Sequence, residues 1–164
     1  MQIRAARPDE AGELSELALR SKGHWGYDED FLARCRAELT LAPGDIERRR
    51  TSVAEHRGRI LGFVTVQGDP PDGELGMLFV DPPAIGTGVG RRLFQHAVAV
   101  AEALGFTRLE IGSEPYAEPF YRAMGATRIG TIPSGTFPGR TLPRMSIATT
   151  PARPRATNRR HADS

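Results

Sequence analysis

The fold of this chain is decided by the stretch Val80-Asp81-Pro82-Pro83-Ala84-Ile85-Gly86-Thr87-Gly88-Val89-Gly90-Arg91-Arg92-Leu93. An apolar segment runs into a proline turn, then three alternating glycines, then a long helical pattern without a break. Glycines at such a junction let backbone N–H groups approach a ligand closely. The first turn of the helix leaves N–H donors unpaired at the positive end of its dipole. The stretch therefore predicts an anion site, and a phosphate group is the anion we expect.

The spacing of the glycines argues against two common nucleotide sites. A dinucleotide fingerprint requires Gly-x-Gly-x-x-Gly after the first strand, with an acidic residue about 20 positions further on. Here Gly86, Gly88 and Gly90 follow a Gly-x-Gly-x-Gly pattern in mid-chain, and no fitting acidic residue ends the next strand. A Walker loop requires Gly-Lys-Ser/Thr, which the chain lacks. On the glycines alone, a tight turn without a ligand stays open as an alternative.

The segments on either side predict an α+β fold. Helical spacing of apolar residues continues after the glycines through Leu93, Ala97 and Leu104, and Gly105 ends that helix. Further helices are expected from Pro8, over Asp28–Leu39 and over Pro115–Met124. Strands are expected over Gln2–Arg4, Thr51–His56, Arg59–Gln67, Leu75–Val80, Arg108–Ile111, Ala126–Thr131 and Arg144–Thr149. This order predicts a mixed, mostly antiparallel sheet of six to seven strands flanked by about four helices in three layers.

Length and composition bound the class of protein. The 164 residues, 39% hydrophobic and 26% charged, suit one soluble globular domain, which we place over residues 1–149. No run of about 18 apolar residues is present, so no membrane partner is expected. The single cysteine, Cys35, excludes an internal disulfide and argues against a zinc site, and no metal is expected. The N-terminus shows no signal-peptide pattern, and a cytoplasmic location is the expectation.

The basic character of the chain comes mostly from its C-terminus. Residues 151–164 hold four arginines and one aspartate, a net charge of +3, while the whole chain has +2. Subtraction leaves 2 − 3 = −1 for the remainder. Residues 150–164 show no apolar period and are expected to form a disordered Arg-rich tail. A solvated tail is the simpler interpretation, and nucleic acid is not expected as a partner.

The order of motifs resembles the GCN5-related N-acetyltransferase family. The resemblance rests on Leu78–Pro82, Gly86–Leu93, Ala103–Phe106 and Phe120–Ala126, and it follows the element order over about residues 2–149. It implies the acyl-CoA N-acyltransferase fold, with a splayed parallel pair in the sheet. It also implies an enzyme that binds acetyl-CoA and transfers the acetyl group directly to a primary amine, here expected on a small molecule. Relatives often form homodimers, so a dimer is a further expectation.

The resemblance assigns a cofactor site. The family's Arg/Gln-x-x-Gly-x-Gly/Ala loop binds the pyrophosphate, and its two glycines correspond to Gly88 and Gly90. Ile85 stands at the Arg/Gln position, so main-chain donors must do more of the binding. The strand before the loop is implied to pair its backbone with the pantetheine arm. The expected cofactor residues are Leu78, Phe79, Val80, Gly86, Thr87, Gly88, Val89, Gly90 and Arg91.

The resemblance also proposes catalytic groups. Tyr121, within Phe120–Gly125, corresponds to a tyrosine that protonates the leaving thiolate. An acceptor amine with a pKa near 10.4 must lose a proton, which costs about 4.6 kcal/mol at pH 7, so a base should help. Glu74, just before the buried strand, stands where relatives often place this base. His24 and a bound water are the alternatives.

Two loops are expected to form the acceptor site. The segment between the first two helices contains His24, Trp25 and Tyr27, whose rings suit a small ligand or a cation. Arg140, in the Gly/Pro loop before the last strand, suits a substrate carboxylate. Glu114 stands where relatives often carry an Asn that contacts the cofactor. Because Ile85 and Glu114 both depart from the family pattern, a non-catalytic acyl-CoA-binding sensor module is the alternative function.

Overall fold

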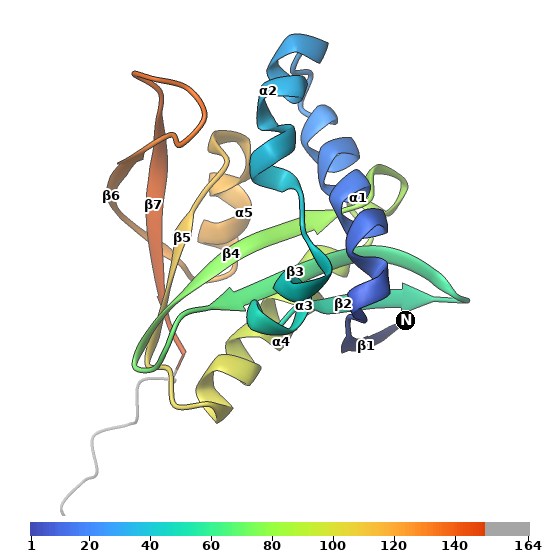
Figure 1. The fold of residues 1–164 in the computed structure, drawn as a ribbon. Helices are drawn as coiled ribbons and strands as arrows, with labels where there is room; N and C mark the ends of the chain where they lie inside the picture. The colour runs from blue at the N-terminus through green and yellow to red at the C-terminus, as the bar shows by residue number, and fades with distance from the viewer. Residues whose placement is uncertain (150–164) are drawn as a thin grey trace, which may run out of the picture.

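One seven-stranded sheet organises the chain (Figure 1). The computed structural model describes residues 1–149, so the predicted tail at 150–164 lies outside the described residues. The sheet has the order β1-β2-β3-β4-β5-β7-β6, and only the β4–β5 pair is parallel. The strands are β1 (Gln2–Ala5), β2 (Ser52–His56), β3 (Arg59–Gln67), β4 (Asp72–Val80), β5 (Arg108–Gly112), β6 (Thr127–Pro133) and β7 (Thr141–Ala148). The predicted fold class is confirmed.

Helices cover both faces of this sheet. The α-helices are α1 (Ala11–Gly23), α2 (Glu29–Leu39), α3 (Pro43–Arg48), α4 (Val89–Ala103) and α5 (Glu118–Ala123). Three 3-10 turns, η1 (Pro8–Glu10), η2 (Pro82–Ala84) and η3 (Pro115–Ala117), precede α1, α4 and α5. Buried residues of α1 and α2 share one core cluster with Phe63 and Met77, whereas those of α4 share another with Val64 and Leu109. None of the helices in residues 1–149 is long and apolar enough to cross a bilayer.

Helix α4 lies very close to β3. Leu93 is fully buried, and a Cβ atom built on Gly62 would lie 3.0 Å from its Cδ1. The same Cβ would lie 2.7 Å from the backbone oxygen of Phe79 on β4. Only a glycine fits at this position without displacing a neighbour. The contact fixes the helix that follows the glycine turn against the central strands.

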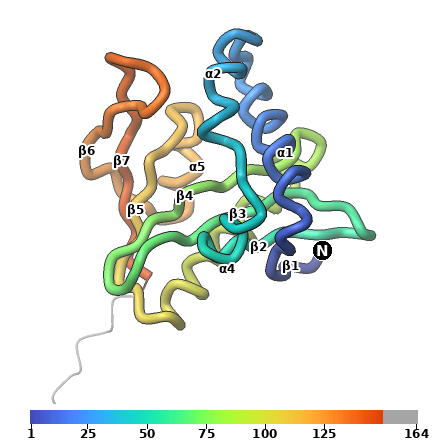
Figure 2. Tube along the Cα trace, viewed as in Figure 1, coloured from blue at the N-terminus to red at the C-terminus, as the bar shows by residue number. Residues whose placement is uncertain are grey.

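The parallel pair is joined over a short ladder only. Asp72, Gly73 and Glu74 of β4 pair with Arg108, Leu109 and Glu110 of β5. Beyond Glu74, β4 contains a bulge, since Leu75 to Leu78 spans three steps where Val66 to Val64 on β3 spans two. The two strands then diverge toward their carboxyl ends (Figures 1 and 2). The predicted splay is present, and it leaves the β5-facing edge of Leu75–Val80 without a strand partner within the described chain.

A buried carboxylate near the N-terminus should make the fold acid-sensitive. Both oxygens of Glu10 accept hydrogen bonds from Arg4 at 2.8 Å, and the backbone N–H of Arg7 donates another. These bonds, the Arg4 bond above all, lower the pKa of Glu10 from 4.5 to about 2. A lowered pKa stabilises the native state above about pH 4.5, and this contribution is lost as pH falls toward about 2.

We therefore expect Glu10→Gln to remove about 2–3 kcal/mol of stability near pH 6, and to flatten the acid dependence. Urea unfolding at a series of pH values measures both effects. Glu13→Gln, on an exposed carboxylate of α1, is the matched control and should keep the wild-type dependence. An unchanged acid slope in Glu10→Gln would contradict the assignment.

Candidate active site

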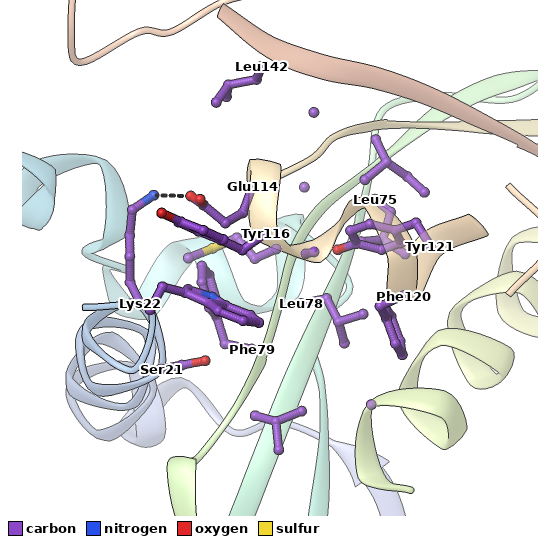
Figure 3. A pocket seen from close by; sticks show the side chains of 18 of the residues that line it. Ser21, Lys22, Leu75, Leu78, Phe79, Glu114, Tyr116, Phe120, Tyr121 and Leu142 are labelled. Carbon is purple, nitrogen blue, oxygen red and sulfur yellow. Dashed lines mark ion pairs between the residues drawn. The ribbon is translucent and has the colours of Figure 1, made fainter. Parts of the chain in front are cut away.

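A cavity of about 550 Å³ lies where β4 and β5 diverge (Figure 3). Its walls include Leu75–Val80 of β4, the glycine turn before α4, and one face of α5. The opposite part is formed by the last turn of α1, by α2, by the segment after β5 and by the loop before β7. The cavity therefore reaches from the N-terminus of α4, past the free edge of β4, to the helices on the other face of the sheet.

The glycine turn presents its backbone at one end of this cavity. Gly86 and Gly88 have φ values of 84° and 91°, which side-chain-bearing residues rarely adopt. Gly88 is the N-cap of α4, so the unpaired N–H groups of the first helical turn follow it directly. Ile85 is 39% exposed and adds no polar group. These features suit an anion, which main-chain donors and the helix dipole would hold.

Most of the predicted cofactor residues line the cavity, and two do not. Those that line it are Leu78, Phe79, Val80, Gly86, Gly88, Gly90 and Arg91. Thr87 lies outside its lining, because its N–H and hydroxyl both donate to the oxygen of Ala84. Val89 is 3% exposed and packs in the core beneath α4. The periodicity of α4 explains this arrangement, since Val89 shares a buried face with Leu93 and Ala97.

Tyr121 projects from α5 into the middle of the cavity, and its hydroxyl points inward (Figure 3). Its ring is held by Phe94 and Phe120, with centroids 6.0 and 5.2 Å away. The residue is 6% exposed, and burial raises the pKa of its hydroxyl. No residue in the described range hydrogen-bonds to that hydroxyl. A protonated, unpartnered O–H is therefore available for a ligand.

Glu114 places a carboxylate in the other half of the cavity (Figure 3). Its Oε1 accepts a hydrogen bond from the hydroxyl of Tyr27 and lies 3.6 Å from Arg140. Its Oε2 lies 3.4 Å from Nζ of Lys22, yet it is buried and forms no hydrogen bond within the described residues. Burial, followed by the bond to Glu114, raises the pKa of Tyr27. The carboxylate is thus hydrogen-bonded through Oε1, while Oε2 takes part only in the ion pair with Lys22.

Stacked aromatic rings support this half of the cavity. Phe31 of α2 stacks between Tyr27 and Phe137, with centroids 4.0 and 4.4 Å away. The guanidinium carbon of Arg140 lies 5.0 Å from the centroid of the Phe31 ring, and Arg140 donates to Tyr27 at 2.9 Å. The loop before β7 is therefore held against α2, and Arg140 is already engaged within the protein.

The predicted acceptor and base residues are distributed unevenly. Trp25 and Arg140 line the cavity. Tyr27 lies behind Glu114, and His24 is exposed, with its ring edge against Trp25. Glu74 lines a separate hollow on the sheet face, with Glu110 and Arg144. The strand was expected to begin at Leu75, but β4 begins at Asp72, so Glu74 pairs with Glu110 inside the ladder.

Several cavity residues were not found from the sequence. They are Cys35, Glu38 and Tyr116. Helix α1 continues to Gly23 and carries Lys22, whose side chain lines the cavity. Tyr116 follows β5, and the carboxyl ends of adjacent parallel strands meet at one edge of a sheet. That rule could have placed it, together with Glu114, beside the end of β4. Residues 1–149 hold no group of three side chains suited to a metal ion.

Comparison with known proteins assigns the family. The model of the acetyltransferase (GNAT) domain matches residues 30–145, and the chain belongs to this family of acyltransferase enzymes. It is 30% identical over 132 residues to the 5-NmdU N-acetyltransferase of Pseudomonas phage PaMx11, which covers 78% of this chain and 88% of that protein.

Solved structures share the fold. The PaiA N-acetyltransferase from Thermoplasma acidophilum, in complex with coenzyme A, has a TM-score of 0.76 and 17% identity, covering 90% of this chain and 98% of that one. The YncA protein from Salmonella typhimurium, with its cofactor acetyl-CoA, has a TM-score of 0.65 and 22% identity, covering 95% and 98%. At these identities the likeness concerns the fold.

Proposed function

We propose that this chain transfers the acetyl group of acetyl-CoA to a primary amine of a small molecule. The observation that carries the proposal is the continuous cavity through the β4–β5 splay, with an anion site at one end and a polar, aromatic compartment at the other. The phage relative is by name an N-acetyltransferase of 5-NmdU, and two structural neighbours contain coenzyme A or acetyl-CoA. A cytoplasmic location and a homodimer remain predictions.

The residues present suit coenzyme A. Main-chain N–H groups of the turn after Ile85 and of the first turn of α4 would hold the pyrophosphate, and Arg91 lines the cavity nearby. The free edge of Leu78–Val80 would pair with the pantetheine amides as an added strand. Bound acetyl-CoA supplies an acetyl thioester. The chain contributes orientation, exclusion of water and control of protons.

Proton control is the task of the cavity side chains. Transfer forms an N–C bond and breaks a C–S bond, with the electron pair of that bond remaining on sulfur. One proton leaves the nitrogen, and one proton reaches the sulfur. Tyr121 holds its proton because burial raises its pKa, and its hydroxyl is aimed at the centre of the cavity. We assign it as the donor to the leaving sulfur.

The anion site is tested by substituting the N-cap glycine. Gly88→Ala should weaken binding of acetyl-CoA by about tenfold, because a positive φ costs a side-chain-bearing residue about 1–2 kcal/mol and the turn must shift. No atom lies within 4 Å of the added Cβ, so the effect comes from the backbone alone. Gly12→Ala in α1, which also has open space around its Cβ, is the control. Isothermal calorimetry measures both, and equal affinities would place the pyrophosphate elsewhere.

A sensor that binds acyl-CoA without turnover is the second candidate, because Ile85 leaves the turn without the family's polar side chain. Release of free thiol in the presence of a panel of primary amines separates the two functions. Turnover with any amine establishes the enzyme. Binding of acetyl-CoA without thiol release on the whole panel establishes the sensor, and no binding of coenzyme A at millimolar concentration would exclude both.

A further inference from the structure

Glu114 has an acceptor atom inside the cavity that forms no hydrogen bond within the described residues. Tyr27 and Arg140 occupy the Oε1 side of its carboxylate, while Oε2 is buried and has only the Lys22 ammonium group at 3.4 Å as a charge partner. Burying a carboxylate oxygen without a hydrogen bond costs free energy, and an N–H donor from a ligand would reduce that cost. This oxygen therefore marks where an amine of the acceptor can bind.

A pair of aromatic rings lies beside this carboxylate. Trp25, from the turn after α1, and Tyr116, from η3, stack with centroids 5.5 Å apart and planes 13° apart. Both line the cavity, yet they are 39% and 56% exposed, so they form a partly open aromatic wall at its edge. Such faces bind other planar rings, because stacking favours a flat π-system over a saturated one.

The carboxylate and the aromatic wall are close in space. The Tyr116 ring lies 5.9 Å, between centroids, from the ring of Tyr27, whose hydroxyl donates to Glu114. A ligand that uses both groups therefore needs only a short arm between its ring and its amine. Arg140 already donates to Tyr27 through Nη2 and lies against the Phe31 ring, so it supports the carboxylate half of the cavity.

We infer that the acceptor is a primary amine on a short arm of a planar ring, with the ring on the Trp25–Tyr116 pair and the amine on Oε2 of Glu114. This inference rests on the proposed function and names the substrate class of the same site. Glu114 then accepts the proton that leaves nitrogen as the N–C bond forms, and passes it to water. Tyr121 donates to the sulfur and is reprotonated from water, so protons and electrons balance.

Lys22 strengthens this assignment. Its ammonium group lies 3.4 Å from the same carboxylate oxygen, close to where the amine would bind. A neighbouring positive charge lowers the pKa of a bound amine. Lys22 therefore favours the neutral, nucleophilic form of the acceptor amine. A carboxylate alone would instead favour the charged ammonium form.

The test compares benzylamine with cyclohexylmethylamine, which carry the same aminomethyl arm on a planar and a saturated ring. Each is titrated into protein loaded with coenzyme A, where no reaction occurs. Trp25 is the only tryptophan, so its fluorescence reports binding directly. We expect the dissociation constant of benzylamine to be about fivefold or more below that of cyclohexylmethylamine. This comparison uses the wild-type protein and needs no variant to fold.

Three variants test the role of Glu114. Glu114→Gln should weaken benzylamine binding by about tenfold or more while coenzyme A affinity is retained. Glu110→Gln, a carboxylate on β5 outside the cavity lining and bound to Arg144, should leave both affinities unchanged. Tyr27→Phe removes the hydrogen bond to Oε1 of Glu114 but leaves its Oε2 in place. This variant should therefore lose less affinity for benzylamine than Glu114→Gln.

The outcomes separate the two levels of the proposal. If the protein binds coenzyme A but holds both amines equally, or if Tyr27→Phe and Glu114→Gln weaken benzylamine equally, the inferred acceptor class is wrong while the proposed function stands. If wild-type protein binds no coenzyme A, the proposed function itself fails. Selective benzylamine binding that depends on Glu114 supports the inference.

Discussion

Replacing Tyr121 with Phe should lower kcat by a factor of about 10²–10⁴, the usual contribution of a positioned general acid. The substitution removes only the hydroxyl, and that hydroxyl has no partner within the described residues whose loss would disturb the fold. The ring stays packed against Phe94 and Phe120. Initial rates of thiol release at saturating acetyl-CoA and amine measure the effect. The leaving sulfur then receives its proton from water.

Two controls separate this chemical role from a structural one. Acetyl-CoA affinity and the urea midpoint should be close to wild type in Tyr121→Phe. Tyr116→Phe removes a phenol from the same cavity and keeps its ring, so it should lose far less activity. Burial raises the pKa of Tyr121, so its hydroxyl should remain protonated below about pH 10. The kcat of the wild-type enzyme should therefore not fall through ionisation of this group in that range. A kcat within a few-fold of wild type in Tyr121→Phe would remove the residue from the mechanism.

The donor half of the site was predictable because its signals are local in sequence. The glycine turn, the helix after it and the strand before it adjoin along the chain, so their spacing places Gly86, Gly88 and Leu78–Val80 together. Tyr121, proposed from its motif, lines the same cavity. The exceptions are Thr87 and Val89, which do not line the cavity. Which residues of this turn face the cavity depends on where the helix begins, and its N-cap is Gly88.

The acceptor half was harder to predict because it is assembled from four distant segments. Its side chains are far apart in the sequence, and whether they meet depends on the sheet order and on where α1 ends. They include Lys22, Glu38, Glu114 and Phe137. Glu74 shows the same difficulty. A shift of the strand start from Leu75 to Asp72 moves it from a turn to the ladder, and its side chain reaches the other hollow. Ion pairs such as Lys22–Glu114 cannot be read from spacing.

Leu93→Ala should destabilise the fold by about 2–5 kcal/mol, as is usual for truncating a fully buried leucine. Leu93 packs from α4 against β3 at Gly62. Its truncation therefore leaves a void beneath the helix whose N-terminus is proposed to bind the anion. Leu104→Ala is the matched control, because Leu104 follows the same helix and is 48% exposed. It should cost under about 0.5 kcal/mol, which is typical of surface substitutions. Urea unfolding measures both.

Adding the cofactor connects this stability to function. A ligand that binds only the native state adds about 2.7 kcal/mol at a concentration of 100 times its dissociation constant. Acetyl-CoA should therefore restore much of the unfolding midpoint of Leu93→Ala, and Gly88→Ala introduced into the same background should reduce that gain at equal ligand concentration. If Leu93→Ala is rescued equally well with and without Gly88→Ala, the N-terminus of α4 is not where the cofactor is held. If Leu93→Ala lowers the free energy of unfolding no more than Leu104→Ala, then α4 is not held against the sheet through its buried face. The contact between Leu93 and Gly62 would then not explain a rigid anion site.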